Sequence, residues 1–557
     1  ILGLSRMPWD LETAKTHLAF FWDEVNLRLS KVHPMVLIGT TAVSIYSYQK
    51  LRNILRRNDR PIHKRFLGYI MSCARSLPFV ENRIQAEFTT IREEIMESIH
   101  KYDHDRVFIK ELPPNGLSPQ EVVEKAKEYS KMGLFDVDGG RVSGAVYTDR
   151  ESKFMSMLGE VFMMYAYSNP LHPDVFPGVR KMEAEVVRMV ADMYHGPPES
   201  CGSMTTGGTE SIMLACLAYR NRAQSRGIAE PNMVIPVTAH AAFDKAGIAL
   251  NIRIKHVPVD ENNKVNIKAM KRAIDSETCM LVGSAPNFPT GTVDDIIAIA
   301  TLGLKYKVPV HVDACLGGFL IPFMEDAGFE IPLFDFRLLG VTSVSCDTHK
   351  YGYAPKGTSV VLYRSPEYIH HQYFSVTDWT GGIYATPSLP GSRSGLAIAE
   401  TWATMVYFGR LSYVERAKAI ISKTRELKNE IEKVPGLSIH GTPDVSVVAF
   451  KSSEFNVYAV ADKLNNLGWN LNTLQNPDSV HFCVTYNQIH DNLVSQFISD
   501  LRKACDEVRN MPNKGGSSKT AAIYGTAAII PDRNLVSSIT HVFLDACTAT
   551  PSKSEEK

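Results

Sequence analysis

The segment with the clearest chemical potential runs from Ser345 to Gly352 and contains the pair His349-Lys350. The lysine follows the apolar run GVTSVS and enters a loop that contains glycine. In α/β proteins, ligands bind at the carboxyl ends of such strands. A lysine amine can form a Schiff base with a carbonyl cofactor, of which pyridoxal phosphate is the common one. Most lysines are solvated surface residues, so this hypothesis needs support elsewhere in the chain.

Three further patterns offer the parts that such a cofactor requires. Asp313 ends the apolar run VPVHVDA, where it would keep a pyridine nitrogen protonated or simply cap the next helix. The run TGGTES (206–211) lets backbone N–H groups approach a phosphate, although Thr209 could instead form an ordinary capping box. His240 ends VIPVTAH and could stack on a flat ring or serve the fold alone. The order of these motifs along the chain is stronger evidence than any one of them.

The elements that would position these residues alternate between two patterns. Short apolar runs at 234–240, 280–286, 308–314, 340–350 and 358–364 are typical of strands buried on both faces. Helical stretches separate them, which predicts an α/β fold with a mainly parallel, doubly wound sheet. From residue 414 a charged helix precedes strands near 445–451 and 479–486, with one helix between them and another at 491–510, which predicts a small α+β domain.

These patterns predict five parts of the chain. They are an N-terminal segment (1–65), a helical extension (66–165), a large cofactor-binding domain (166–413), the small C-terminal domain (414–510), and a linker with a docked tail (511–557).

The N-terminal segment contains an uncharged run from Pro34 to Tyr48. A bilayer span needs about 20 apolar residues, so a membrane helix and a buried helix are both open interpretations. Basic residues from Lys50 to Arg65 follow the run and would place the rest of the chain in the cytosol if it spans a membrane. A solvated helix face or an RNA-binding arm are alternatives, but the basic run has few aromatic residues.

Composition excludes several classes of protein. The 557 residues carry 60 basic and 60 acidic side chains, so the global positive charge of a nucleic-acid binder is absent. Nine cysteines without C-x-x-C spacing predict reduced thiols rather than a disulfide framework or a zinc site, and we expect no metal.

Longer motifs add a resemblance to a known family. GGTES, TAHAAFDKA, HVDACLGGF and DTHKYGYAPKG, in this order, resemble fold-type I pyridoxal-phosphate enzymes of the group II decarboxylase lineage. The runs YSNPLHPDVFPGVRKMEAEVVRM and DWTGGIYATPSLPGSRSG are similar to the sphingosine-1-phosphate lyase family. The resemblance extends from about residue 105 to 545.

The resemblance implies a role for each matching residue. Lys350 would hold pyridoxal 5'-phosphate, Asp313 would pair with its ring nitrogen and His240 would stack on its ring. The cofactor phosphate would be bound by Gly208, Thr209 and His349. In a homodimer with shared sites, Gly381 and Gly382 would reach the partner's cofactor. The substrate phosphate would be bound by Tyr147, Asn169, His172, Lys356 and Arg393.

The implied reaction cleaves the C2–C3 bond of a phosphorylated sphingoid base, giving a long-chain aldehyde and phosphoethanolamine. The resemblance also implies one span in the endoplasmic reticulum membrane, with the catalytic part in the cytosol. The base that removes the C3 hydroxyl proton stays open between Lys356, Tyr147 and the cofactor phosphate. An amino-acid decarboxylase would share every cofactor residue and would release carbon dioxide. A non-catalytic scaffold is a third alternative, against which an intact Lys350 and Asp313 argue.

Overall fold

The computed structural model describes residues 20, 22–56, 70, 78–103, 106–515 and 533–550. The chain divides into two compact units, 1–59 and 60–557, and each is described by itself.

In the first unit, helix α2 (Pro34–Arg56) contains the whole uncharged run. Its apolar side chains are exposed, for example those of Met35, Ile38 and Val43. The helices of the described residues include none that combines the length and the apolarity of a membrane span. The side chains of the basic run from Lys50 to Arg65 lie outside the described residues.

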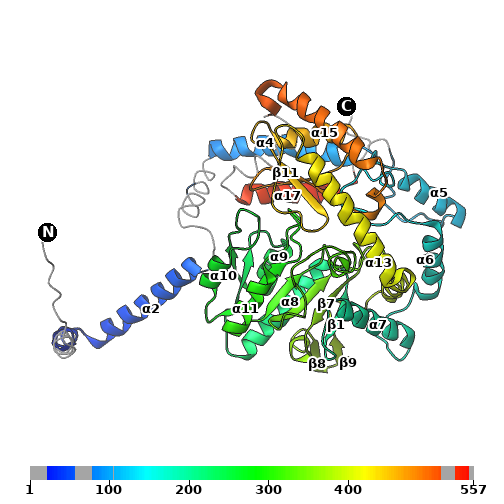
Figure 1. The fold of residues 1–557 in the computed structure, drawn as a ribbon. Coiled ribbons are helices and arrows are strands. Elements are labelled where there is room, and N and C mark those ends of the chain that lie inside the picture. The colour runs from blue at the N-terminus through cyan, green and yellow to red at the C-terminus, as the bar shows by residue number, and fades with distance from the viewer. Residues whose placement is uncertain are drawn as a thin grey trace. The chain divides into compact units, whose positions relative to one another are not determined.

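The second unit is built on a seven-stranded sheet (Figure 1). In spatial order its strands are β1 (Cys201–Thr205), β7 (Ser359–Tyr363), β6 (Val341–Cys346), β5 (Val310–Asp313), β4 (Thr278–Ser284), β2 (Asn232–Pro236) and β3 (Arg253–Val257). Strand β7 is antiparallel to both of its neighbours, and the pairs from β6 to β3 are parallel. Six strands therefore share one direction, and their carboxyl ends lie along one edge.

Helices cover both faces of this sheet because successive side chains of a strand point to opposite faces. In β2, Met233 and Ile235 pack in an apolar cluster with residues of α8 (Gly208–Ser225) and α9 (Ala242–Leu250). Val234, between them, belongs to a second cluster with residues of α7 (Pro177–Met193) and α11 (Ile296–Tyr306). Helix α10 (Ile267–Ala273) contacts β2 and β3.

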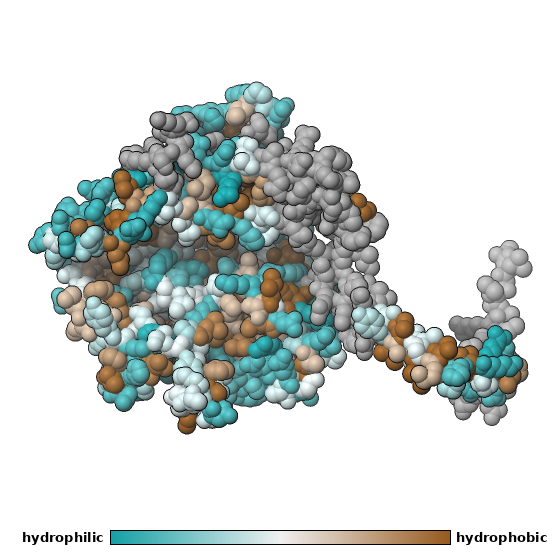
Figure 2. All heavy atoms as spheres, turned by 180° about the vertical axis from the view of Figure 1, so that it is seen from behind, coloured by the Kyte–Doolittle hydropathy of each residue, from teal (hydrophilic) through white to brown (hydrophobic). Residues whose placement is uncertain are grey.

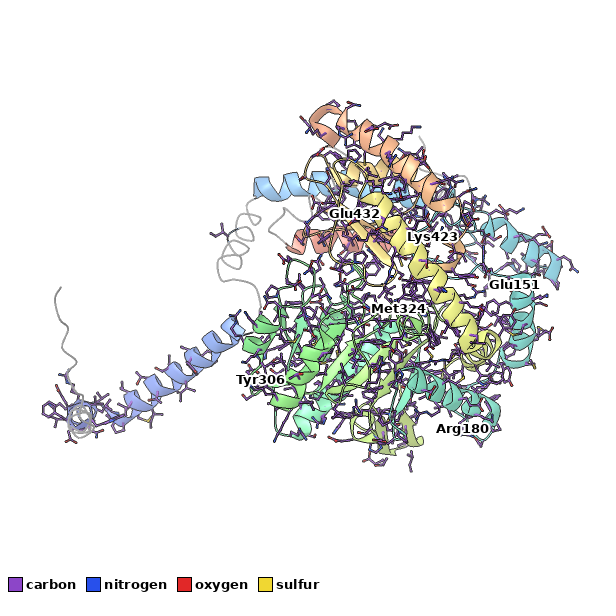
Figure 3. The ribbon with its side chains drawn as sticks, in the orientation of Figure 1. Glu151, Arg180, Tyr306, Met324, Lys423 and Glu432 are labelled. Atoms are coloured by element: carbon purple, nitrogen blue, oxygen red, sulfur yellow. The ribbon has the colours of Figure 1, made fainter. Side chains whose placement is uncertain are left out.

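A four-stranded antiparallel sheet follows later in the chain. Its strands are β10 (Ser438–Ile439), β11 (Val447–Lys451), β13 (Ser479–Cys483) and β12 (Asn472–Leu474), and it packs with α14 (Val457–Asn466) and α15 (Leu493–Arg509). Helix α13 (Gly395–Ile431) is broken at Gly409, whose φ of 61° is non-helical. Its second half is the helix that the sequence predicts from residue 414, and Figure 3 labels Lys423 and Glu432 at that end.

The remaining elements lie outside these two sheets. They are α4 (Pro78–His100), α5 (Pro119–Ser130), α6 (Ser152–Tyr165), α12 (Pro366–Ile369), α17 (Arg533–Thr548), and the hairpin of β8 (Phe374–Trp379) and β9 (Gly382–Thr386). Helix α17 packs on α4, and His100 Nε2 lies 3.1 Å from the carbonyl oxygen of Ala546. The predicted linker falls largely on residues 516–532, outside the described part of the chain.

All five predicted strands of the large sheet are confirmed, as is its mainly parallel character. The antiparallel direction of β7 was not predicted. Only residues 347–358 separate it from β6, and this connection holds no helix that could carry a parallel crossover.

Candidate active site

The predicted cofactor residues follow the carboxyl ends of strands that share one direction. Lys350 comes four residues after β6, Asp313 is the last residue of β5, and Gly208 begins the helix after β1. His240 comes four residues after β2. All four therefore follow the carboxyl ends of strands along one edge of the large sheet; the sequence predicts this for Lys350, Asp313 and His240, whereas β1 before Gly208 was not predicted.

The amine of Lys350 is held by a neighbour that the sequence analysis did not single out. Lys350 Nζ lies 2.8 Å from Asp347 Oδ2, and the Asp347 side chain is only 2% exposed. Burial acts to lower the pKa of Lys350, but attraction to Asp347 and the hydrogen bond to it, together with the effects of Tyr147 and Cys315, raise the pKa above the usual lysine value. The other oxygen, Asp347 Oδ1, is buried and has no hydrogen-bond partner among the described residues.

The loop before α8 leaves the helix N-terminus open. Gly207 is the N-cap residue and no side chain caps the helix, so the capping box considered for Thr209 does not form. Glu210 instead turns back and accepts bonds from the N–H and the hydroxyl of Thr206, both at 2.7 Å. A Cβ at Gly208 would lie 2.7 Å from Asp347 Oδ1 and 2.8 Å from the sulfur of Cys315, so a larger residue there would have to displace one of these buried side chains.

His349 lies beside this loop with a defined tautomer. Its Nδ1 accepts a hydrogen bond from the N–H of Thr358 at 3.0 Å. Burial lowers the pKa of His349, and repulsion by Lys356 and Lys350 adds to the effect, so the imidazole is neutral at pH 7. The remaining proton is therefore on Nε2, which can donate to a phosphate oxygen.

Hydrogen bonds from the described residues reach one of the two carboxylate oxygens of Asp313. Its Oδ1 accepts from the N–H of Cys315 at 3.0 Å and from Ser345 Oγ at 3.2 Å. In the described part of the chain no hydrogen bond reaches its Oδ2. The carboxylate is 6% exposed, so a protonated ring nitrogen would be a fitting partner for this second oxygen.

Lys356 and Tyr147 form a second layer next to Lys350. Lys356 Nζ lies 4.7 Å from the centre of the Tyr147 ring and donates to the carbonyl oxygen of His349 at 3.3 Å. Burial and then repulsion by Lys350 lower the pKa of Lys356. Burial raises the pKa of Tyr147, which is 6% exposed. The tyrosine therefore stays a neutral phenol, and the lysine is the more easily deprotonated partner.

Other predicted residues make no hydrogen bond or ring contact with Lys350 or Lys356 among the described residues. His240 is exposed and contacts Phe288 edge-on, with ring centres 6.5 Å apart. Asn169 donates to Ser392 Oγ at 3.1 Å and accepts from the N–H of Arg393 at 3.3 Å. His172 is exposed close by in sequence.

Among the described residues, neither Arg393 nor Gly382 has a hydrogen bond, ion pair or ring contact with Lys350 or Lys356. Both terminal nitrogens of Arg393 bond the carboxylate of Glu183, at 2.5 and 2.9 Å, so its charge is already paired. Gly382 follows the turn of the exposed β8–β9 hairpin, with a φ of 99°.

Three residues near Lys350 were not predicted from the sequence. Asp347 stands in the DTHK motif, and its type and its position three residues before the lysine could have signalled it. Tyr351 packs edge-on against Tyr147, with ring centres 4.9 Å apart, and donates to Ser446 Oγ at 2.6 Å. Cys483 reaches the same place from β13, 3.4 Å from the hydroxyl of Tyr351. No local pattern marks Cys483, because only tertiary packing brings β13 to this site.

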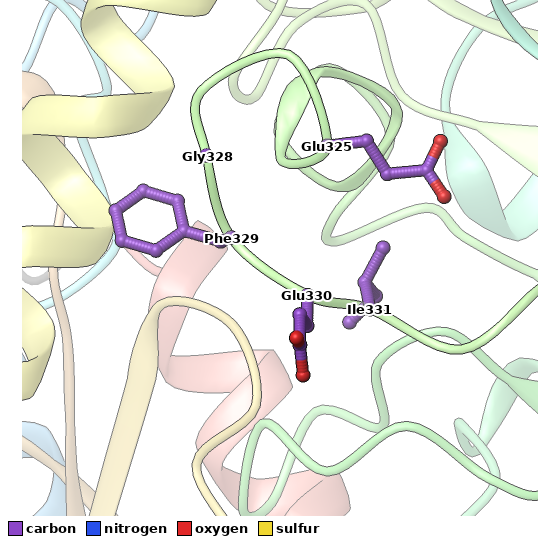
Figure 4. A pocket seen from close by; sticks show the side chains of 5 residues that line it. All are labelled: Glu325, Gly328, Phe329, Glu330 and Ile331. Carbon is purple, nitrogen blue, oxygen red and sulfur yellow. The ribbon is translucent and has the colours of Figure 1, made fainter.

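Two surface hollows lie elsewhere. One of about 330 Å³ is lined by residues between Glu325 and Ile331 (Figure 4), and another of about 460 Å³ lies between α7 and β1 and includes Arg393. Neither is lined by Lys350. Figure 2 also shows a recess across the second unit, bordered by both hydrophilic and hydrophobic residues. No cluster of potential metal ligands occurs among the described residues.

This combination of parts defines a class of enzyme. A lysine amine, an open helix N-terminus, a neutral histidine donor and a buried carboxylate, all at one edge of a doubly wound sheet, fit pyridoxal 5'-phosphate. The family model described as the pyridoxal-dependent decarboxylase conserved domain matches residues 141–453. The chain is thus a carbon–carbon lyase of the pyridoxal-phosphate enzymes, and its cofactor is pyridoxal 5'-phosphate.

The relatives narrow the class. Sphingosine-1-phosphate lyase 1 of Rattus norvegicus is 46% identical over 94% of this chain and 92% of its own length. The sphingosine-1-phosphate lyase of Drosophila melanogaster is 45% identical over 95% and 97%. The solved structure of the Burkholderia pseudomallei sphingosine-1-phosphate lyase is 36% identical, covers 80% of this chain and 98% of its own, and has a TM-score of 0.72. The chain belongs to the sphingosine-1-phosphate lyase family.

Proposed function

We propose that this protein cleaves the C2–C3 bond of sphingosine 1-phosphate and related phosphorylated sphingoid bases. The products are a long-chain aldehyde and phosphoethanolamine. The observation that carries the proposal is the placement of Lys356 and Tyr147 beside Lys350, together with membership of a family whose relatives bear this activity in their names.

In this proposal each site residue has its own role in binding the cofactor. Lys350 binds the cofactor through its amine, and Asp313 holds the proton on the ring nitrogen. Gly208, Thr209 and His349 bind the cofactor phosphate through N–H groups, and His240 covers the ring. When bound to these residues, pyridoxal 5'-phosphate would supply an electron sink for C2.

Lys356 is the base that we assign to the C3 hydroxyl. Its lowered pKa increases the fraction of free amine at neutral pH, which is what a general base requires. Tyr147, whose pKa is raised, keeps its proton and donates a hydrogen bond to the substrate. As Lys356 takes the hydroxyl proton, the C3–O bond becomes a carbonyl, the C2–C3 bond breaks and the aldehyde leaves.

The other predicted phosphate-binding residues point to a shared site between two copies. Asn169, His172 and Arg393 form a surface group, and the neighbouring β8–β9 hairpin exposes Trp379 and Ile383 by 55% and 79%. Large apolar side chains this exposed mark interaction surfaces. A homodimer that covers the hairpin would bring Gly381 and Gly382 of one chain to the cofactor of the other.

Membrane attachment and the location at the endoplasmic reticulum belong to this proposal as well. The exposed apolar residues of α2 would hold the protein at the membrane, with the catalytic unit in the cytosol. Extraction of membranes with alkaline carbonate separates an embedded segment from one that lies on the surface.

The decisive experiment is incubation of the purified holoenzyme with a phosphorylated long-chain base, followed by mass spectrometry of both products. Long-chain aldehyde and phosphoethanolamine in equal amounts support the proposal. Carbon dioxide from an amino acid, without aldehyde, would replace it with a decarboxylase. A protein that binds the cofactor and releases neither product would be a scaffold.

A further inference from the structure

A buried line of hydrogen bonds leads away from Asp313 into the sheet. In the parallel pairing of β5 with β6, His311 is opposite Ser343 and Asp313 is opposite Ser345. His311 and Asp313 are two residues apart, so their side chains share one face of β5. His311, Ser343 and Ser345 are completely buried, and Tyr219 of α8 is 1% exposed.

The bonds of this line join four side chains to the carboxylate. Tyr219 donates its hydroxyl hydrogen to Ser343 Oγ at 2.7 Å. His311 Nδ1 lies 2.8 Å from Ser343 Oγ, and His311 Nε2 lies 3.1 Å from Ser345 Oγ. Ser345 donates to Asp313 Oδ1 at 3.2 Å.

The direction of each bond between Tyr219 and Asp313 follows from counting hydrogens, and Thr342 Oγ1, 2.6 Å from the Tyr219 hydroxyl, then donates to it. Each hydroxyl has one hydrogen, and Ser345 gives its hydrogen to a carboxylate that can only accept. Ser345 must then accept from His311 Nε2–H. A neutral imidazole carries one N–H, so Nδ1 accepts from Ser343, which in turn accepts from Tyr219. Burial lowers the pKa of His311 to about 4, so the imidazole is neutral at pH 7 as this scheme requires.

We propose that His311 is a positioning residue that acts through Ser345 to hold Asp313 ionised and oriented toward the ring nitrogen of the cofactor. The proposal rests on the proposed function and deepens it. Every dipole in the line points its positive end toward Asp313, and hydrogen bonds to a carboxylate favour its charged form. An ionised Asp313 leaves the proton on the ring nitrogen, where the electron sink needs it. His311 itself touches neither cofactor nor substrate.

The test compares three serine-to-alanine variants of the holoenzyme. Ser345→Ala cuts the line next to Asp313, and Ser343→Ala cuts it one bond beyond His311. Ser284→Ala is the matched control. Ser284 is buried in β4, it is opposite Asp313 in the strand pairing, and its hydroxyl has no hydrogen-bond partner among the described residues.

The readouts are the ¹⁵N resonance of the ring nitrogen in enzyme loaded with ¹⁵N-labelled cofactor, and kcat with KM. For Ser345→Ala we expect the resonance to move toward the unprotonated position and kcat to fall at least about tenfold with little change in KM, because a hydrogen bond to a charged group is lost. Ser343→Ala should move both in the same direction by less. Ser284→Ala should match the wild type.

An unchanged resonance in Ser345→Ala, or an equal shift in Ser284→Ala, would overturn the proposal. If Ser345→Ala does not fold, as judged by circular dichroism, Ser343→Ala decides by the same two readouts. The nitrogen resonance needs no turnover, so it still reports if the wild type binds cofactor and does not cleave the phosphorylated base. Failure of the proposed function is thereby separated from failure of this inference.

Discussion

The surroundings of Lys350 and the surface around Asn169 differ in how complete they are within one chain. Near Lys350, Asp347 and Tyr147 are almost fully buried and fixed by ion-pair, cation–π or ring contacts. At the surface that we term the Asn169 surface (Asn169, His172, Arg393 and the β8–β9 hairpin), apolar side chains face solvent. One chain therefore preorganises the surroundings of Lys350, whereas in our proposal the Asn169 surface becomes part of the site only when a second copy covers it.

The largest effect is expected from replacement of Lys350, whose surroundings are provided by a single chain. Lys350→Ala should abolish turnover and leave the fold intact, because no amine remains to bind the cofactor or release the product. Loss of the visible absorption band of the bound cofactor, beside an unchanged circular dichroism spectrum, checks this. Substantial lyase activity at ordinary cofactor levels would remove Lys350 from its assigned role.

Replacement of the proposed base should have the next largest effect. Lys356→Met should lower kcat by about 10²- to 10⁴-fold, because general-base assistance to the C3 hydroxyl is lost. If Lys356 only binds phosphate, KM rises and kcat stays.

The pH profile separates these two roles of Lys356. The amine acts as a base when neutral, so kcat of the wild type should rise as pH increases, with a midpoint below the usual lysine value because the pKa of Lys356 is lowered. Lys356→Arg should lose this rise, because a guanidinium stays protonated. An identical rise in the arginine variant would assign the base elsewhere.

The Asn169 surface can be disrupted through the hairpin. Trp379→Glu places a charge on an exposed apolar strand and should weaken association of the two copies. Activity per chain should then fall about tenfold at low protein concentration and recover at high concentration. Sedimentation velocity measures the oligomer, and Leu304→Glu on α11 is the control for a charge on an exposed leucine. A fully active monomer would contradict the shared site.

Replacement of Arg393 tests whether this side chain binds the substrate phosphate or stabilises the fold. Both terminal nitrogens of Arg393 bond Glu183, so Arg393→Met should destabilise the fold by about 1–3 kcal/mol because the partly buried carboxylate loses its charged partner and keeps only the N–H of Met204. Thermal unfolding measures this, and Arg180→Met, an exposed arginine on α7 (Figure 3), is the control. If KM rises and the stability of the fold is unchanged, Arg393 instead binds the substrate phosphate.

The smallest effect on catalysis is expected from removal of the first unit. A chain that starts at residue 60 keeps α4, which packs on α17, and every proposed site residue. Its kcat on detergent-dispersed substrate should equal that of the whole chain, while its sedimentation with vesicles should be lost. Full vesicle binding by the shortened chain would place the membrane contact elsewhere.

The sequence alone predicts the buried strands, because unbroken apolar runs of β-branched residues are read locally. It also predicts that Lys350, Asp313 and His240 follow strands, and parallel direction then places them along one edge; strand β1 before the loop of Gly208 was not predicted. The roles of these residues came from a resemblance in their motifs. The predicted domain boundaries and site roles stay predictions until variants test them.

Only the tertiary structure decided which side chains meet. It brought Cys483 from the small sheet to Tyr351, and aligned His311 and Ser345 beneath Asp313. It also turned β7 antiparallel and paired Arg393 with Glu183. Each of these contacts joins residues on different strands, helices or loops, and the register and packing that bring such elements together depend on the whole core rather than on any local run of sequence.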